Sequence, residues 1–249
     1  MSGHSKWANI KYKKAAQDAK KGRVFTKIAR EITVAVKHGG EDSTANPRLR
    51  LALDKAKSVN MPKDNVERAI KKGTGAGNEE NYEDVIYEGY GPGGVALLVS
   101  VLTDNKKRTV ADVRRILTRH GGSLGESGCV GWIFERKGII RLNKNDVSEE
   151  KLYNLAIEAG ALDINTQDDS YEVFVEPQDL EQFKEIFVNN GIKIESAEAT
   201  MRPKNTIPVE KEDAKKLINL LNELDEHDDV QDVYSNFEID DSILEELKV

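Results

Sequence analysis

The clearest signal of fold in this chain lies in residues 139–200, whose sequence is IIRLNKNDVSEEKLYNLAIEAGALDINTQDDSYEVFVEPQDLEQFKEIFVNNGIKIESAEAT. Apolar residues here switch between the two-residue period of strands and the 3.6-residue period of helices. The pattern predicts strands near 139–142, 161–166, 170–175 and 192–198, and helices near 148–159 and 178–190. Strand, helix, strand, strand, helix, strand is the ferredoxin-like order. We therefore expect a ferredoxin-like domain in this part of the chain.

The segments on either side supply the parts of another α/β domain. Before the ferredoxin-like stretch, the sequence predicts strands at 85–89 and 95–102, a turn at 90–94 and a helix near 108–120. After Pro203 and Pro208, it predicts a helix through 217–224 and a strand through 230–237. Two strands and one helix are too little for a stable core. We therefore expect residues 79–128 and 205–249 to form one middle domain, into which residues 129–204 are inserted.

Residues 1–78 are predicted to form an all-helical domain, because no strand-like alternation occurs before residue 80. Residues 1–23 are expected to be an arm leading into a helix, and a second helix follows as far as Gly39. Asn46 and Pro47 cap a third helix. Pro62 opens a fourth, which Gly73 is expected to end.

The predicted fold class is therefore α+β and multidomain. An N-terminal all-helical domain is followed by two α/β domains of the ferredoxin-like type, the third inserted in the second. The glycine-rich stretch 73–80 lacks the P-loop pattern and precedes no helix, so a flexible hinge is favoured over a phosphate-binding loop.

Charge is distributed very unevenly along the chain. The net charge of the whole chain is −7, yet residues 1–78 hold 13 Lys and 5 Arg against 4 Asp and 3 Glu, a net of +11. The remaining residues then carry a net of −18. This asymmetry favours a polyanion, either DNA or RNA, as the partner of the basic part. The alternative is a basic surface that docks on the acidic remainder of the chain.

Composition also limits the class of protein. The single cysteine, Cys129, can form no disulfide within the chain and supplies no thiolate cluster, which fits a reducing compartment. The longest apolar run, Val95–Leu102, is far shorter than the ~20 residues that a membrane span needs. We expect a soluble, cytoplasmic protein with no membrane partner.

Short motifs along nearly the whole chain identify a family resemblance. They are SGHSKWANIK at 2–11, AAQDAK at 15–20, FTK at 25–27, REI at 30–32, PRLR at 47–50, MPKDN at 61–65, YEGYGPGG at 87–94, TDNKKRT at 103–109 and LDEHDDVQDVY at 224–234. Together they resemble the YebC family. The resemblance implies three domains, the third inserted in the second, and a non-enzymatic role in gene expression. It implies either a DNA-binding transcriptional regulator or a ribosome- or RNA-binding translation factor. Mitochondrial relatives are translational activators, and the resemblance to bacterial members implies a ribosome-associated factor that relieves stalled synthesis.

The N-terminal arm is the first candidate nucleic-acid site. Its cations are Lys6, Lys11, Lys13, Lys14, Lys20, Lys21 and Arg23. Such dense charge repels itself unless an anion relieves it, which favours contact with phosphates. Trp7 and Tyr12 lie among these lysines and are candidates for stacking on bases. An anchor on the helical core is the favoured alternative for the aromatic residues, since tryptophan gains most from burial.

The helix after Asn105 is the second candidate. Arg108, Arg115 and Arg119 lie at i, i+7 and i+11, on one predicted stripe. A phosphate contact and an ordinary solvated face are equally good interpretations of this stripe.

The acidic run around His227 has residue types that bind metals but lacks the spacing of a known metal site. Asp225, Glu226, Asp228 and Asp229 lack the spacing of a calcium loop, and no second His or Cys lies nearby in the sequence. A solvated turn is the favoured interpretation, with contact to a basic partner surface as the other.

No catalytic pattern stands out. The four histidines show no zinc-protease spacing, and neither a nucleophile elbow nor a Walker motif is present. We therefore expect no enzyme activity, no cofactor, no metal and no small-molecule substrate. The expected partners are DNA or RNA, with the ribosome as a further candidate.

Overall fold

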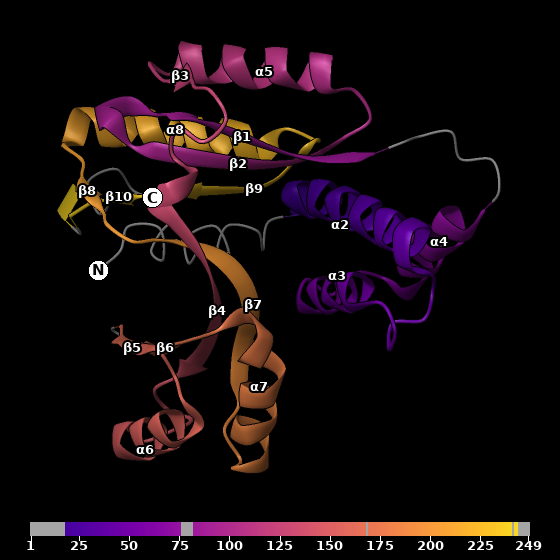
Figure 1. Cartoon of the computed structure of the whole chain (residues 1–249), viewed down its shortest axis with the longest axis vertical. Coiled ribbons are helices and arrows are strands. Elements are labelled where there is room, and N and C mark those ends of the chain that lie inside the picture. The colour runs from indigo at the N-terminus through magenta and orange to yellow at the C-terminus, as the bar shows by residue number, and fades with distance from the viewer. Residues whose placement is uncertain (1–17, 76–81, 168, 241, 244–249) are drawn as a thin grey trace. The chain divides into compact units, whose positions relative to one another are not determined.

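A computed structural model describes residues 18–75, 82–167, 169–240, 242 and 243 (Figure 1). The described residues divide into two compact units. The inserted unit comprises residues 132–204, and the outer unit comprises the described residues before and after it. The further division of the chain into three domains, with boundaries at 78, 128 and 204, stays a prediction.

The inserted unit has the predicted ferredoxin-like topology. Its elements are β4 (Phe134–Asn143), α6 (Glu149–Ala159), β5 (Asp163–Thr166), β6 (Ser170–Val175), α7 (Leu180–Asn189) and β7 (Ile194–Pro203). The sheet order is β5-β6-β4-β7, and every neighbouring pair is antiparallel. Alternate residues of β4, among them Ile140 and Leu142, are buried against Leu152 of α6 and Phe183 and Phe187 of α7. The α+β fold class is thereby confirmed for this part.

Strands β4 and β7, which pair with each other, are longer than the sequence predicts. Pairing runs from Phe134 opposite Pro203 to Leu142 opposite Ile194, whereas strands near 139–142 and 192–198 were expected. The extra length of β4 includes Glu135, Arg136 and Lys137, which are not buried. Charged residues on a partly solvated strand weaken the apolar pattern from which strands are predicted.

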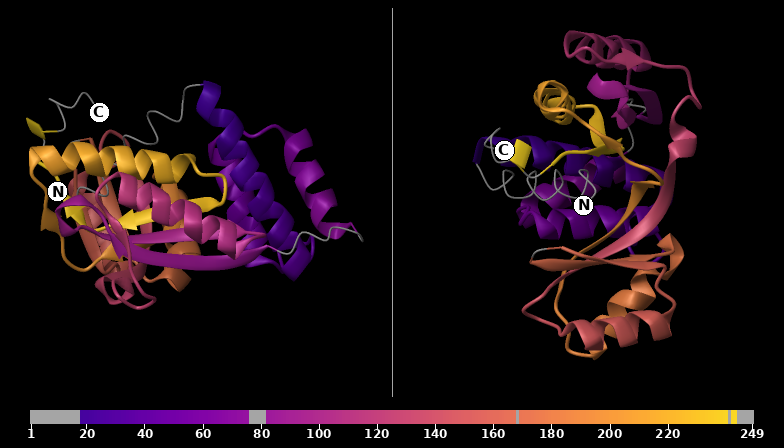
Figure 2. Two further views of the ribbon diagram at one scale, coloured as in Figure 1. Left: turned by 90° about the horizontal axis from the view of Figure 1, so that it is seen from above. Right: turned by 90° about the vertical axis from the view of Figure 1, so that its left-hand side faces the viewer.

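In the outer unit, the segments before and after the insertion share one sheet. It contains β1 (Glu83–Tyr90), β2 (Ala96–Thr103), β3 (Ser123–Leu124) and β9 (Val230–Ser235), in the order β3-β1-β2-β9. Residues of β2 are almost all buried, as befits a central strand. Helices α5 (Lys106–Arg119) and α8 (Lys211–Glu226) lie side by side over this sheet (Figure 2). The short strands β8 (Ile207–Pro208) and β10 (Phe237–Glu238) form a separate parallel pair.

The described N-terminal part is helical, as predicted. It consists of α2 (Asp18–Gly39), α3 (Pro47–Ser58) and α4 (Lys63–Thr74) around a core that includes Ile32, Leu49, Ala56 and Ala69. The expected start of a second helix after residue 23 is wrong, because α2 is continuous from Asp18. Gly22 does not interrupt α2, and it lies at an exposed position with open space around it. No helix in the described ranges is long and apolar enough to cross a bilayer.

Gly73 has a different role from the predicted one. It does not end α4, which continues to Thr74. A side chain at Gly73 would lie 2.7 Å from the carbonyl oxygen of Thr33 and from Cβ of Val36. The glycine therefore allows α4 to pack closely on α2. The predicted hinge that follows it falls mostly on residues 76–81, outside the described ranges.

We expect Asn46→Ala to lower the free energy of unfolding by about 2 kcal/mol. The buried Asn46 accepts a hydrogen bond from the Leu49 amide and donates two, to the carbonyl oxygens of Ala35 and Gly40. Alanine leaves all three groups without this partner. Urea denaturation measures the change. Asn219→Ala, at an exposed position of α8, is the control and should shift stability by less than about 0.5 kcal/mol.

Candidate nucleic-acid interface

Most of the predicted arm site lies outside the described residues. Lys6, Trp7, Lys11, Tyr12, Lys13 and Lys14 fall in residues 1–17. Lys20 and Lys21 belong to the first turns of α2, but their side chains are outside the description. The remaining predicted residues, Arg23, Arg108, Arg115 and Arg119, are described. Each of these four arginines contacts a carboxylate of the same chain.

Three cations of α2 face one acidic turn. We call Arg23, Lys27 and Arg30 the inner cation row, since their spacing of i, i+4 and i+7 places them on one side of the helix. Residues 225–229, which comprise the last two residues of α8 and the turn that leads to β9, are called the acidic turn. Because these two sets lie about 200 positions apart in the sequence, their charge complementarity could not be predicted from local pattern.

The inner cation row contacts both carboxylates and backbone carbonyl oxygens. Nη1 of Arg23 lies 3.3 Å from Oε2 of Glu226. Nζ of Lys27 donates to the carbonyl oxygen of Asp225 and lies 3.8 Å from its Oδ1. Nη1 of Arg30 donates to Oδ1 of Asp229 and to the carbonyl oxygen of Asp228, each at 2.9 Å. This part of the basic domain therefore docks on acidic residues of the chain, which is the alternative that the charge distribution left open.

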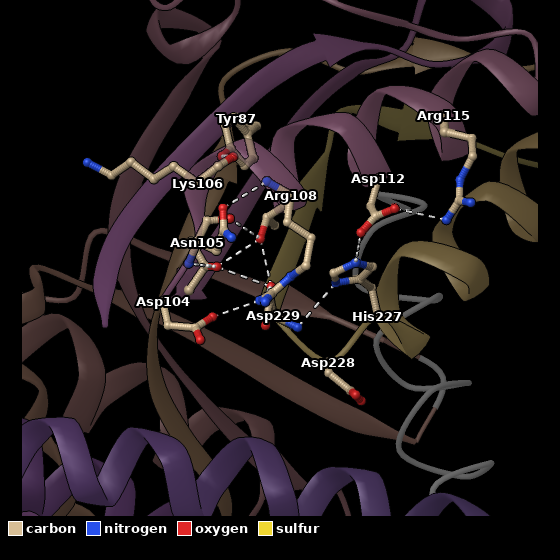
Figure 3. Close-up of polar contacts among 12 residues, drawn as sticks. Tyr87, Asp104, Asn105, Lys106, Arg108, Asp112, Arg115, His227, Asp228 and Asp229 are labelled. Carbon is tan, nitrogen blue, oxygen red and sulfur yellow. Dashed lines mark hydrogen bonds and ion pairs between the residues drawn. The ribbon is translucent and has the colours of Figure 1, made fainter. Parts of the chain in front are cut away.

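Asp229, the last residue of the acidic turn, has a buried carboxylate surrounded by hydrogen-bond donors (Figure 3). Oδ2 accepts hydrogen bonds from Thr109 Oγ1 at 2.6 Å, Arg108 Nη2 at 2.8 Å and Thr103 Oγ1 at 3.2 Å. The expectation of a solvated turn is wrong for this residue, of which only 3% is exposed. A buried carboxylate is stable here because each of its oxygens has a donor.

The electrostatics keep Asp229 ionised. Burial alone would raise its pKa. The hydrogen bonds from Thr109 and Arg108, and the charges of Arg108 and Arg30, outweigh that effect and lower the pKa from its ordinary 3.8 to about 2. A carboxyl group with so low a pKa stays an anion at neutral pH and is a poor general acid or base. Its evident role is to hold cations in place.

His227 connects the acidic turn to α5 (Figure 3). Its Nδ1 accepts from the amide of Asp229 at 3.2 Å, and its Nε2 lies 3.6 Å from Oδ2 of Asp112. Asp112 in turn accepts from Nη2 of Arg115 at 3.0 Å. The histidine is thus engaged in fixing the turn. Among the residues that the structure describes, no group of three or more His, Cys, Asp or Glu is arranged to hold a metal ion.

A polar hollow of about 610 Å³ opens beside the turn. Arg30 lies over the ring of Tyr82 there, 5.1 Å from the ring centroid. The lining residues are Arg23, Arg30, Tyr82, Asp104, Arg108, Glu226, His227, Asp228 and Asp229. Charges of both signs line the hollow, which suits an interface between charged segments better than a pocket for one ion.

The predicted arginine stripe of α5 is held by acids. Arg108 bonds Asp104 as well as Asp229, and Nη1 of Arg119 lies 2.6 Å from Oε1 of Glu223. A neighbouring stripe is more open. Lys107 and Arg114 are exposed and pair with no described acid, and the exposed Ala111 and Thr118 continue the same row. The sequence carried this signal, since residues 107, 111, 114 and 118 lie opposite the apolar face of the helix.

The helical part also presents cations that no described acid neutralises. Arg50 of α3 and Lys63 and Lys71 of α4 are exposed, and none forms an ion pair with a described carboxylate. Sequence reasoning concentrated on the arm and did not single them out. Their exposure could have been predicted from the sequence, because each falls outside the apolar stripe of its helix.

Comparison with protein families accounts for both parts of the chain. Residues 5–76 match the family model described as the TACO1/YebC protein N-terminal domain. Residues 82–237 match the model described as the TACO1/YebC second and third domain. The chain belongs to the TACO1/YebC family. The resemblance inferred from the sequence motifs is thereby confirmed.

Relatives within the TACO1/YebC family align over nearly their full length. A protein of Dictyoglomus turgidum is 54% identical, over 99% of this chain and 100% of its own. One of Natranaerobius thermophilus is 53% identical, over 98% and 99%. Both carry the name "Probable transcriptional regulatory protein". The crystal structure of a conserved hypothetical protein from Aquifex aeolicus is 49% identical, with a TM-score of 0.81 over 91% of this chain and 94% of that one.

Proposed function

We propose that this TACO1/YebC family member is a non-enzymatic, nucleic-acid-binding regulator of gene expression. The observation that carries the proposal is the set of exposed cations without described acid partners in the helical part, namely Arg50, Lys63 and Lys71, within a region of net charge +11. Unpaired basic density of this kind is the electrostatic footprint of phosphate binding. The names of the relatives agree with a regulatory role.

The proposed contact surface begins at the arm. Its cations are Lys6, Lys11, Lys13, Lys14, Lys20, Lys21 and Arg23, with Trp7 and Tyr12 as candidate stacking residues. On α5, the open Lys107 and Arg114 would meet phosphates first. Arg108, Arg115 and Arg119 would have to exchange carboxylates for phosphates, so we propose them as secondary contacts.

Contact with phosphates positions a protein on nucleic acid but does not read its sequence. We therefore propose weak sequence specificity on DNA. Structured RNA, including that of ribosomes, is the alternative target, since proteins often recognise it by shape. The two targets are separated by adding unlabelled ribosomes or unlabelled random duplex as competitors to the protein bound to labelled DNA. A single promoter duplex that resists excess random DNA and excess ribosomes would establish specific transcriptional recognition instead.

Reversing the four lysines Lys13, Lys14, Lys20 and Lys21 to Glu should abolish measurable binding to a labelled duplex. The expectation follows from counterion release, because each phosphate neutralised contributes a slope of about −0.9 to the plot of log affinity against log salt. Fluorescence anisotropy at several salt concentrations measures both affinity and slope. The wild-type slope should be steep, and the variant should retain the circular dichroism spectrum of the folded protein.

A matched variant controls for total charge. Lys151, Lys193, Lys215 and Lys216 are exposed and lie outside the basic domain. Their replacement by Glu makes the same change in net charge and should alter affinity by less than about 3-fold. Equal losses in both variants would contradict the assignment of the site to residues 1–78. A wild-type protein that binds neither DNA nor RNA would contradict the proposed function itself.

A further inference from the structure

Several ion pairs join the helical part of the outer unit to the sheet part. Besides the contacts of the inner cation row, Arg48 donates to both carboxylate oxygens of Asp84, at 2.8 and 2.9 Å, and Lys55 lies 3.6 Å from Asp232. The buried apolar residues of α2–α4 and those of the sheet with α5 and α8 form separate clusters. Ion pairs therefore contribute to this junction.

The acidic turn presents its carboxylates to α2 as a phosphate backbone would. Three anionic residues, Asp225, Glu226 and Asp229, meet three cations placed along one side of a helix. The inner cation row is consequently occupied in the free protein. A polyanion can use Arg23, Lys27 and Arg30 only if these carboxylates leave, so the turn and the polyanion compete for the same charges.

We propose that the acidic turn is an internal competitor for nucleic acid, and that binding of a polyanion to the inner cation row releases α2–α4 from the sheet. The proposal rests on the proposed function of the basic part. It assigns two states to the protein: a docked state, in which the turn covers the row, and a released state, in which phosphates replace it. A ligand that binds only the released state must shift the population toward it.

The contacts divide into those that open and those that stay. Arg23 and Glu226 are each about half exposed, so their attraction is weak and is screened by salt. Asp229 remains bound in the released state, because Arg108, Thr103 and Thr109 hold its Oδ2 from within the sheet part. Arg30 would leave Oδ1. The turn therefore keeps its shape while the helical part moves.

The first test measures affinity for a random-sequence DNA duplex. The double variant Asp225→Asn, Glu226→Gln removes two competing charges at exposed or half-buried positions and should bind about 5-fold more tightly or better, within the usual range of coupling between sites. The control is Glu210→Gln, Glu212→Gln. These exposed residues flank the other end of α8, and the change in net charge is the same. An equal gain in both variants would overturn the proposal, since it would show only long-range attraction.

The second test measures opening of the junction directly, with salt alone and with duplex. Spin labels at Ser58→Cys in α3 and Thr118→Cys in α5, with Cys129→Ser, report the distance between the helical part and the sheet part in the full chain. We expect one distance at low salt and a longer population when sodium chloride or duplex is added. Asp225→Asn, Glu226→Gln should show the longer population at low salt already.

The two tests separate the failures. A distance unchanged by high salt, or by duplex at saturation, would overturn the internal competition even if the protein binds nucleic acid. Wild-type protein that opens with salt and binds neither DNA nor RNA would overturn the proposed function while supporting a charge-held junction. It would also overturn the assignment of nucleic acid as the releasing ligand.

Discussion

Asp229→Ala should lower the free energy of unfolding by about 2–4 kcal/mol. The substitution removes the acceptor for two guanidinium groups and for the buried hydroxyl groups of Thr103 and Thr109. Breaking a fully buried pair costs roughly 3–5 kcal/mol, and the half-exposed Arg108 can recover part of that loss from water. Urea denaturation at neutral pH measures the change.

Two further variants make the Asp229 result specific. Asp229→Asn keeps the shape and removes the charge, and should cost about 2 kcal/mol, the order of magnitude that corresponds to lowering a pKa from 3.8 to about 2. Asp228→Ala is the neighbouring control. Its side chain is exposed and contacts no described partner, so the change should be within about 0.5 kcal/mol. Equal effects at positions 228 and 229 would contradict the special role of Asp229.

The pH dependence of stability follows from the same shift. The pKa of Asp229 is lower in the folded protein than in the unfolded chain, so the unfolded chain binds the extra proton as the solution becomes acidic. The stabilisation is complete above about pH 5 and is lost as the pH falls toward 2. Wild type should therefore lose its advantage over Asp229→Asn in that window. A constant difference between the two from pH 7 to pH 2 would contradict this account.

The sequence predicted local structure well because local structure depends on periodicity. Alternation of apolar residues locates β4, β6 and β7, and the i, i+3, i+4 pattern locates α5–α8. Two strands before residue 128 could be matched with one after residue 205, since neither segment can bury its apolar face alone. In the structure, β2 pairs with β9.

The contacts of charged residues could not be predicted in the same way. A run such as Asp225–Asp229 is compatible with a solvated turn or with an ion-pair network, and only the fold brings Arg30 and Arg108 to it. The acids that pair with Arg108, Arg115 and Arg119 could not be predicted for a related reason. Helical spacing gives the direction of a side chain but not the acids that lie within its reach.

The hydrogen-bond partners of Glu88 could not be predicted from the motif in which it lies. It belongs to the YEGYGPGG run that pointed to the family, yet nothing near it in the sequence suggests its partners. Oε1 accepts from the amide of Gly128 at 2.7 Å, and Oε2 accepts from those of Val130 and Gly131 at 2.8 and 2.7 Å. This one carboxylate therefore fixes the loop that follows β3 and leads to residue 132, where the inserted unit begins.

Glu88→Ala should cost about 2–4 kcal/mol of unfolding free energy. Burial raises the pKa of Glu88, but the three amides outweigh burial and lower it, so the group is a carboxylate at neutral pH. Hydrogen bonds to a charged acceptor are the strong ones, and burial of Val130 keeps solvent from replacing the lost acceptor of its amide. Denaturation gives the free energy, and hydrogen exchange at residues 128, 130 and 131 should show lost protection.

Cys129 provides an independent readout of the same loop. Burial raises the pKa of its thiol, and the charge of Glu88 raises it further. Glu88→Gln should therefore lower that pKa and speed the reaction of Cys129 with a thiol reagent, because the thiolate is the reactive form. Glu126→Gln is the matched control: Glu126 also raises the pKa of Cys129, but its side chain holds none of these amides. If Glu126→Gln exposes the loop amides as fully as Glu88→Ala does, general charge rather than the three hydrogen bonds orders this loop.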